Sequence, residues 1–166
     1  MPGQANPTII DIEASGLSSM SYPIEVGVAM ANGEKYCSLI IPAPDWTHWD
    51  DEAHQVHGIP REMLYSHGKS PEEVAVQLNE QLKGKMVYSD AWVVDKPWLI
   101  TLFHAAKVAM EFQISPLEAI LSESQMARWH DTKDQVISDL GVARHRASND
   151  AWIIQETYIR TLLELE

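Results

Sequence analysis

The chain has 166 residues, a length that suits one core, so we expect residues 1–166 to form a single domain. A hydrophobic content of 45% and six tryptophans favour a compact globular protein over a disordered one. The net charge of −12 argues against tight, extended, non-specific binding of duplex nucleic acid, which usually requires a basic face. A short contact at a site with bound cations remains compatible with this charge.

The sequence shows no sign of membrane insertion or secretion. No apolar run approaches the ~20 residues that span a bilayer, and residues 1–4 lack the charged and apolar regions of a secretory signal. Cys37 is the only cysteine, so no internal disulfide can form. We therefore expect a cytoplasmic protein, with Cys37 as a small buried side chain in a strand.

The first third of the chain predicts three antiparallel strands. Residues 8–13 and 23–30 are rich in β-branched and apolar side chains. Asn32 and Gly33 are typical of a type I′ hairpin turn, so residues 36–41 are predicted to return as the third strand. Residues 43–67, rich in aromatic and histidine side chains, are predicted to form short helices or irregular structure that lines a substrate groove or fills a corner of the core.

The rest of the chain predicts alternating helices and short strands. Ser70 and Pro71 are typical of a helix start, and Gly84 ends the helix that they begin. Further strands are predicted at 86–89 and 112–114, and helices at 96–110, 117–140 (in two pieces around 129–132) and 149–163. The expected fold class is α/β: one domain with a mixed five-stranded sheet flanked by helices.

Two carboxylates lie close together on the first predicted strand. Asp11 and Glu13 are two residues apart, so both side chains point to the same face. Neighbouring carboxylates repel each other unless a cation lies between them. Taken alone, the pair is better explained by an edge strand with one solvated polar face.

A third acidic position lies at the start of a predicted helix. Asp95 precedes Pro97, an arrangement that suits a helix N-cap, a metal ligand or both. Asp90 is a rival ligand. Trp92 and Trp98 flank the segment, where they either stack a nucleic-acid base or fill the core.

The last candidate segment joins a loop to the final predicted helix. If that helix begins near residue 148 or 149, Asp150 lies in its first turn and His145 in the loop before it. A histidine has an unperturbed pKa of about 6.5, which suits the deprotonation of a metal-bound water. Arg144 and Arg146 are suited to phosphate contact, or they belong to an ordinary surface loop.

Taken together, these segments resemble the motifs of the DEDD superfamily of 3′–5′ exonucleases, in its histidine-bearing branch. Residues 11–16 (D-I-E-A-S-G) resemble its first motif, D-x-E-T-T-G, and the segment around Asp95 resembles its second. Residues 145–151 (H-R-A-S-N-D-A) resemble its third motif, H-x-A-x-x-D-A. Residues 23–27 (P-I-E-V-G) and 57–59 (H-G-I) are similar to further family segments, and all five occur in the family's order.

The resemblance implies an RNase H-like fold and two Mg²⁺ or Mn²⁺ ions. Asp11, Glu13, Asp95 and Asp150 would hold the metals, and His145 would be the general base. One ion would activate the attacking water and the other would stabilise the leaving 3′-oxygen. The side chains expected to bind substrate are Ala14, Ser15, Gly16, His57, Trp92, Trp98, Arg144 and Arg146.

We therefore expect a metal-dependent 3′–5′ exonuclease that hydrolyses single-stranded DNA or RNA from its 3′ end. An oligoribonuclease-like enzyme for very short oligonucleotides is an alternative that compactness and acidity suit. A non-catalytic nucleic-acid or protein-binding module on the same fold is the alternative from another class. Many relatives of this fold are homodimers, so a homodimer is compatible with the resemblance.

Overall fold

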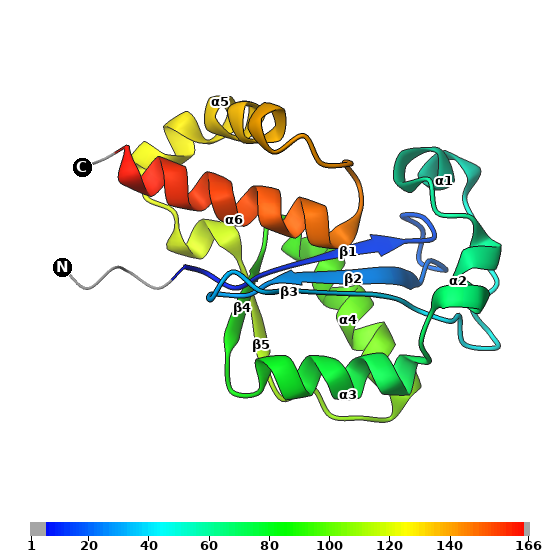
Figure 1. Ribbon diagram of the computed structural model, residues 1–166. Coiled ribbons are helices and arrows are strands. Elements are labelled where there is room, and N and C mark those ends of the chain that lie inside the picture. The colour runs from blue at the N-terminus through cyan, green and yellow to red at the C-terminus, as the bar shows by residue number, and fades with distance from the viewer. Residues whose placement is uncertain (1–5, 165–166) are drawn as a thin grey trace.

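The computed structural model describes residues 6–164 and contains a five-stranded sheet in the order β3-β2-β1-β4-β5 (Figure 1). The strands β1 (Ile9–Ala14), β2 (Pro23–Ala29) and β3 (Lys35–Leu39) form an antiparallel meander. β4 (Met86–Ser89) pairs parallel to β1, and β5 (Gln113–Pro116) pairs parallel to β4. The predicted α/β fold with one mixed sheet is therefore confirmed. Residues 1–4, for which we expect no secretory signal, lie outside the described part.

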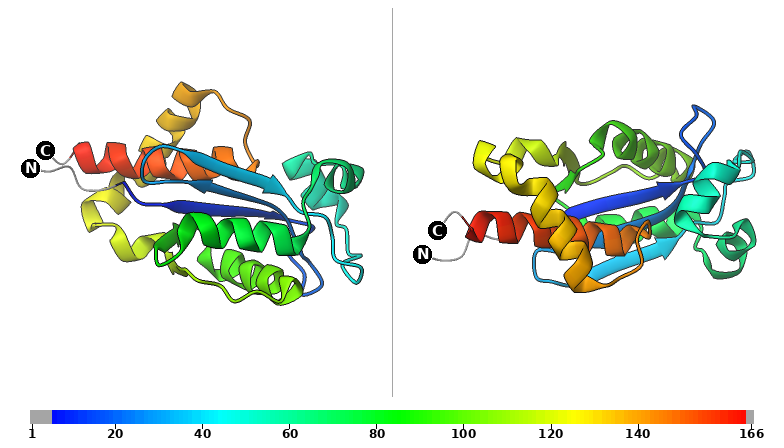
Figure 2. Two further views of the ribbon diagram at one scale, coloured as in Figure 1. Left: turned by 60° about the horizontal axis from the view of Figure 1, so that its bottom comes forward. Right: turned by 90° about the horizontal axis from the view of Figure 1, so that it is seen from above.

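Helices cover both faces of this sheet (Figures 1 and 2). α6 (Ala147–Leu163) packs on β1 and β2, and α5 (Glu123–Leu140) packs on α6. α3 (Pro71–Leu82) and α4 (Trp92–Ala106) pack against each other below the sheet in Figure 1. The short helices α1 (Asp51–His57) and α2 (Arg61–His67) lie beyond the end of β1, and a 3₁₀ turn (Leu117–Ile120) links β5 to α5. Within residues 6–164, no helix is both long and apolar enough to cross a membrane.

The two faces of β1 serve different layers. Ile10 and Ile12 belong to the larger hydrophobic core, together with residues of α3 and α4. Ile9 packs with side chains of α6 on the other face. Because alternate residues of a strand share a face, Asp11 and Glu13 point in the direction of Ile9, toward α6.

Helix α4 runs from Trp92 to Ala106, and the predicted range 96–110 is wrong at both ends. Pro97 lies inside the helix, where it leaves the carbonyl of Val93 without a helical partner; Val93 is exposed, so water can reach that carbonyl. Asp95 is therefore not the N-cap: Ala91 takes that position without a side-chain hydrogen bond. Lys107 ends the helix in the left-handed conformation.

Three further expectations are corrected. The predicted break at 129–132 is absent from α5; the interruption comes earlier, where Ser122 and Gln125 form a capping box. α6 begins at Ala147 rather than at residue 149, because Arg146 is its extended N-cap. Cys37 is exposed rather than buried, since it lies on β3 at the edge of the sheet.

Candidate active site

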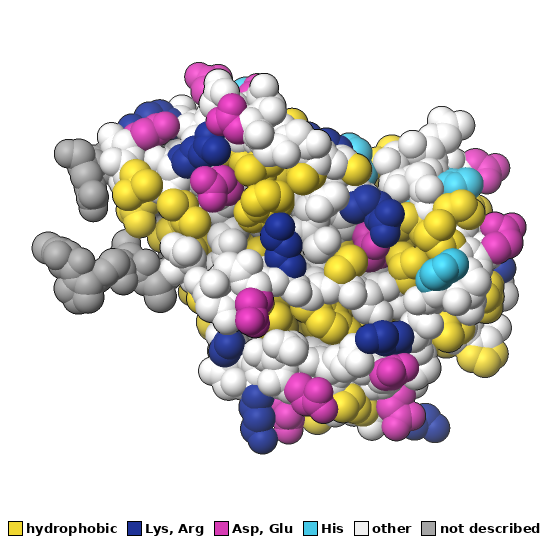
Figure 3. Space-filling view, viewed as in Figure 1, with side chains coloured by type: hydrophobic (Ala, Val, Ile, Leu, Met, Phe, Trp, Pro, Cys, Tyr) yellow, Lys and Arg dark blue, Asp and Glu magenta, His cyan; other side chains and the backbone are white. Residues whose placement is uncertain are grey.

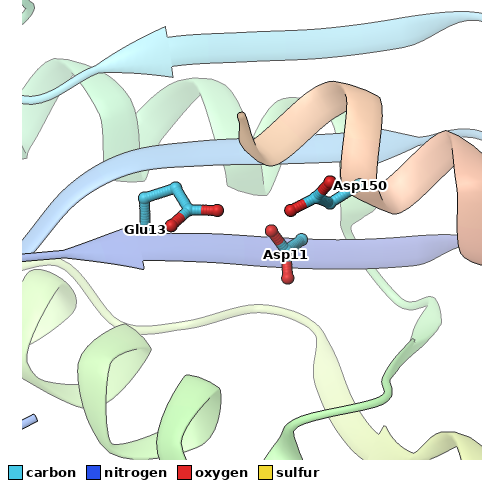
Figure 4. Close-up of side chains that lie close together, drawn as sticks. All are labelled: Asp11, Glu13 and Asp150. Carbon is cyan, nitrogen blue, oxygen red and sulfur yellow. The ribbon is translucent and has the colours of Figure 1, made fainter. Parts of the chain in front are cut away.

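Three carboxylates meet between β1 and the beginning of α6 (Figure 4). Asp11 and Glu13 project from β1 toward α6, and Asp150 projects from the first turn of α6 toward them. One carboxylate oxygen of each residue lies within 4.8 Å of the others. The packing of α6 across β1 thus brings together residues that are far apart in the sequence.

Burial and repulsion from neighbouring carboxylates disfavour the charged forms of Asp11 and Glu13. Burial, followed by the charge of Asp95, raises the pKa of Asp11 well above its ordinary value. Burial and the charge of Asp150 raise the pKa of Glu13 to about 8. Asp11 Oδ2 is buried and has no hydrogen-bond partner among residues 6–164. A divalent cation would satisfy this oxygen and offset the repulsion, so the all-oxygen donor set fits Mg²⁺ or Mn²⁺.

Asp95 lies beside this cluster and outside its 4.8 Å group. It comes from the first turn of α4, is buried, and accepts a hydrogen bond of 2.6 Å from the Ser89 hydroxyl. Burial raises the pKa of Asp95 to about 7. Among the neighbouring charges, that of Asp95 contributes most to the raised pKa of Asp11.

All four acidic residues line one cavity of about 270 Å³. Arg144, His145 and Lys133 line it too, so cationic and ionisable groups join the carboxylates at its wall. Lys133 comes from α5, and its Nζ lies 3.9 Å from Asp90 Oδ2 in the same cavity. Lys133 was not predicted as a site residue from the sequence, because no motif surrounds it on that helix.

The loop before α6 folds around the carboxylate of Asp150. The backbone N–H of His145 donates to Asp150 Oδ1 at 3.1 Å, and Arg144 Nε donates to the same oxygen at 3.4 Å. His145 has a φ of 62°, a left-handed conformation that is uncommon outside glycine. Its Nδ1 lies 4.0 Å from Asp150 Oδ2, so the imidazole is next to the carboxylate cluster.

A second cavity, of about 180 Å³, adjoins the first, because Glu13 and Trp98 line both. Its wall is mainly apolar and, besides Trp98, includes three more of the residues expected to bind substrate. Those residues are Ala14, Gly16 and His57. The end of β1, α1 and α4 therefore form an apolar recess next to the carboxylates.

His57 is a polar residue in the wall of this recess. Its Nδ1 accepts the backbone N–H of Ile59 at 3.0 Å. Burial, and then the proximity of His54, lower the pKa of His57 to about 4, so the ring is neutral near pH 7. Nε2 therefore carries the hydrogen, and it is buried without a partner among the described residues. His57 thus carries an unpaired, buried N–H donor at a residue that lines the recess.

The other three predicted substrate residues line neither cavity. Ser15 is fully buried and accepts the N–H of Tyr22 at 3.1 Å. Trp92 packs against the core and donates its indole N–H to the carbonyl of Ile114. The guanidinium of Arg146 is bonded to Glu25.

No protein-family model matches the sequence, and no curated protein does either. Solved structures do match. Exonuclease I of E. coli in complex with a dA16 oligonucleotide aligns at a TM-score of 0.69 and 12% identity, over 98% of this chain and 41% of that one. The zinc-bound complex of the same enzyme with single-stranded DNA gives 0.68 and 12%, over 98% and 41%. Exonuclease I of Methylocaldum szegediense gives 0.56 and 16%, over 74% and 29%.

The chain therefore has the fold of these exonucleases. It spans about two fifths of the length of the E. coli enzyme (41%). At such identities the likeness concerns the fold, and the chemistry of the site has to be argued from the residues of this chain.

Proposed function

We propose that this chain is a metal-dependent 3′–5′ exonuclease of the histidine-bearing DEDD branch. The observation that carries the proposal is the meeting of Asp11, Glu13 and Asp150, each with a carboxylate oxygen within 4.8 Å of the others. In addition, Asp11 Oδ2 has no hydrogen-bond partner among the described residues. Partly buried carboxylates at this spacing destabilise a protein that has no cation to place between them. A non-catalytic binding module on the same fold would gain nothing from keeping them.

The residues divide the chemistry of phosphodiester hydrolysis among them. Asp11, Glu13 and Asp150 would hold two Mg²⁺ or Mn²⁺ ions, and Asp95, which lines the same cavity, would be a further ligand. When bound, such ions supply Lewis-acid charge to the attacking and leaving oxygens. His145 accepts the proton of the attacking water, because its imidazole lies at the cavity wall beside Asp150.

The apolar recess receives the base and sugar of the 3′-terminal nucleotide. Trp98 lines both cavities, so it contacts a nucleotide whose phosphate lies at the carboxylates. His57 Nε2–H donates to an oxygen or nitrogen acceptor of that nucleotide, an interaction that satisfies a buried donor. Arg144 and Lys133 contact the phosphates from the other cavity.

The charge of the chain favours a short contact with single-stranded substrate. The net charge is −12, and basic side chains are scattered singly among acidic ones on the face shown in Figure 3. The similar E. coli exonuclease structures are complexes with dA16 and with single-stranded DNA, which supports a single-stranded substrate. The same charge favours a second candidate, an oligoribonuclease-like enzyme that degrades very short oligonucleotides.

Cleavage of 5′-labelled oligonucleotides of DNA and RNA tests the proposal. With Mn²⁺ we expect a ladder of products that shortens from the 3′ end, and with EDTA we expect none. A dinucleotide assayed beside a long strand separates the two candidates, since the oligoribonuclease-like enzyme would prefer the dinucleotide. Cleavage that persists in EDTA, or folded protein that cleaves none of these substrates, would contradict the proposal.

A further inference from the structure

Glu25 is a buried carboxylate that lies next to the site and does not belong to the cluster of Asp11, Glu13 and Asp150. It is on β2, directly opposite Glu13 of β1, and its side chain is 0% exposed. Its oxygens accept from Arg146 Nε at 3.2 and 3.1 Å and from Arg146 Nη2 at 2.7 Å. They also accept the backbone N–H of Ala147 at 2.7 Å. A buried charge with this many donors is fully satisfied and fixed in place.

These bonds attach the beginning of α6 to the sheet. Arg146 is the N-cap of α6 and makes no side-chain cap bond, so the carboxylate of Glu25 accepts the N–H of Ala147 at the start of the first turn in its place. Gly27, two residues further along β2, provides independent evidence of close docking. A Cβ on Gly27 would collide with the backbone of Ala147 and Ser148.

The segment held in this way is the one that carries His145 and Asp150. His145 immediately precedes Arg146 and has the left-handed backbone, which persists only where the surroundings determine it. On one side, Asp150 Oδ1 holds the His145 N–H; on the other, Glu25 holds Arg146 and Ala147. The imidazole and the ligand therefore have their places set from β2.

We propose that Glu25 is a positioning residue, which acts through Arg146 and Ala147 to hold His145 and Asp150 in register with Asp11 and Glu13. The inference rests on the proposed nuclease function. It also gives Arg146 a role other than the predicted phosphate contact, because its guanidinium is bonded to a buried carboxylate and lines neither cavity.

Glu25→Gln tests the inference, because it keeps the shape of the side chain and removes its charge. Groups that orient metal ligands typically account for about 10- to 100-fold in activity, so we expect kcat to fall by that factor with KM within about threefold. Hydrogen exchange of the amides of residues 145–147 should accelerate at the same time. Arg146→Gln should show the same losses, and the double variant should be no worse than either single variant.

Gln155→Met is the matched control. Gln155 also joins α6 to the sheet region from a buried position, donating to the carbonyls of Pro7 and Met30 at 3.0 and 2.8 Å. Its loss should lower Tm and leave kcat of the folded protein and exchange at residues 145–147 unchanged. The inference is overturned if Glu25→Gln behaves like this control, with kcat within twofold of wild type.

Two further outcomes are covered by the same set of variants. If Glu25→Gln does not fold, Arg146→Gln tests the positioning role instead. The side chain of Arg146 is 40% exposed, so the substitution disturbs the interior less than one at the buried Glu25. If the wild type cleaves nothing, the nuclease proposal fails, and exchange at residues 145–147 still tests the positioning role. Unchanged exchange there in both variants would overturn it.

Discussion

Removing the charge of Glu13 should stabilise the metal-free protein at alkaline pH. The folded chain keeps the proton of Glu13 up to a pKa of about 8, against an ordinary value of 4.5. The folded state therefore binds more protons than the unfolded state between these values. The free energy of unfolding must then fall as pH rises through this window. Glu13→Gln carries no such proton, so it should lose less stability over the same range.

The structure sets the size of this effect. Two unit charges 4.8 Å apart repel by about 3.5 kcal/mol at an effective dielectric constant of about 20. A pKa raised from 4.5 to about 8 corresponds to roughly 5 kcal/mol, at about 1.4 kcal/mol per pH unit. We therefore expect Glu13→Gln to be more stable than wild type by about 2–5 kcal/mol at pH 8 and nearly equal to it at pH 5.

Urea unfolding in EDTA at pH 5, 6, 7 and 8 measures the difference directly. Glu80→Gln is the control, because Glu80 is an exposed glutamate on α3, away from the site. The free energy of unfolding of this control should equal that of the wild type at every pH. If the stability of Glu13→Gln parallels that of the wild type from pH 5 to pH 8, or is lower at pH 8, the raised pKa of Glu13 is refuted. The burial and repulsion that support the metal assignment are then refuted with it.

Three other substitutions probe the separate parts of the site. His145→Ala should lower the single-turnover rate constant of cleavage by about 100- to 10,000-fold, while Mn²⁺ still raises Tm. A loss below tenfold would exclude His145 as the general base. Asp150→Asn should abolish both cleavage and the rise of Tm with Mn²⁺, and an undiminished rise would remove it from the ligands. His57→Phe keeps a ring and removes the free N–H, so KM should increase about fivefold, the value of one hydrogen bond; an unchanged KM would place the nucleotide elsewhere.

The sequence predicts the sheet and the three clustered carboxylates well, for local reasons. Strand alternation is enough to put Asp11 and Glu13 on one face, and the structure shows them there. The first turn of the last helix does contain Asp150, even though α6 begins earlier than predicted. These features depend on near neighbours along the chain, which a single sequence displays.

What the sequence did not predict depends on packing between distant segments. The role of Glu25 became visible only when Arg146 was found bonded to it, although a glutamate inside an otherwise apolar strand is a signal that could have been followed. Lys133 reaches the cavity because α5 packs on α6. The N-cap expected at Asp95 was wrong because Pro97 is accommodated within the helix, and a local proline signal does not reveal that.

The central claim is that the carboxylate cluster is the site of metal-dependent cleavage at a 3′ end. The most direct test compares wild type with Glu13→Gln on one 5′-labelled single-stranded oligonucleotide in Mn²⁺. We predict a ladder shortening from the 3′ end with wild type and no products with the variant, although the variant is the more stable protein at pH 8. Equal ladders from both proteins, or cuts in the interior of the strand, would contradict the account.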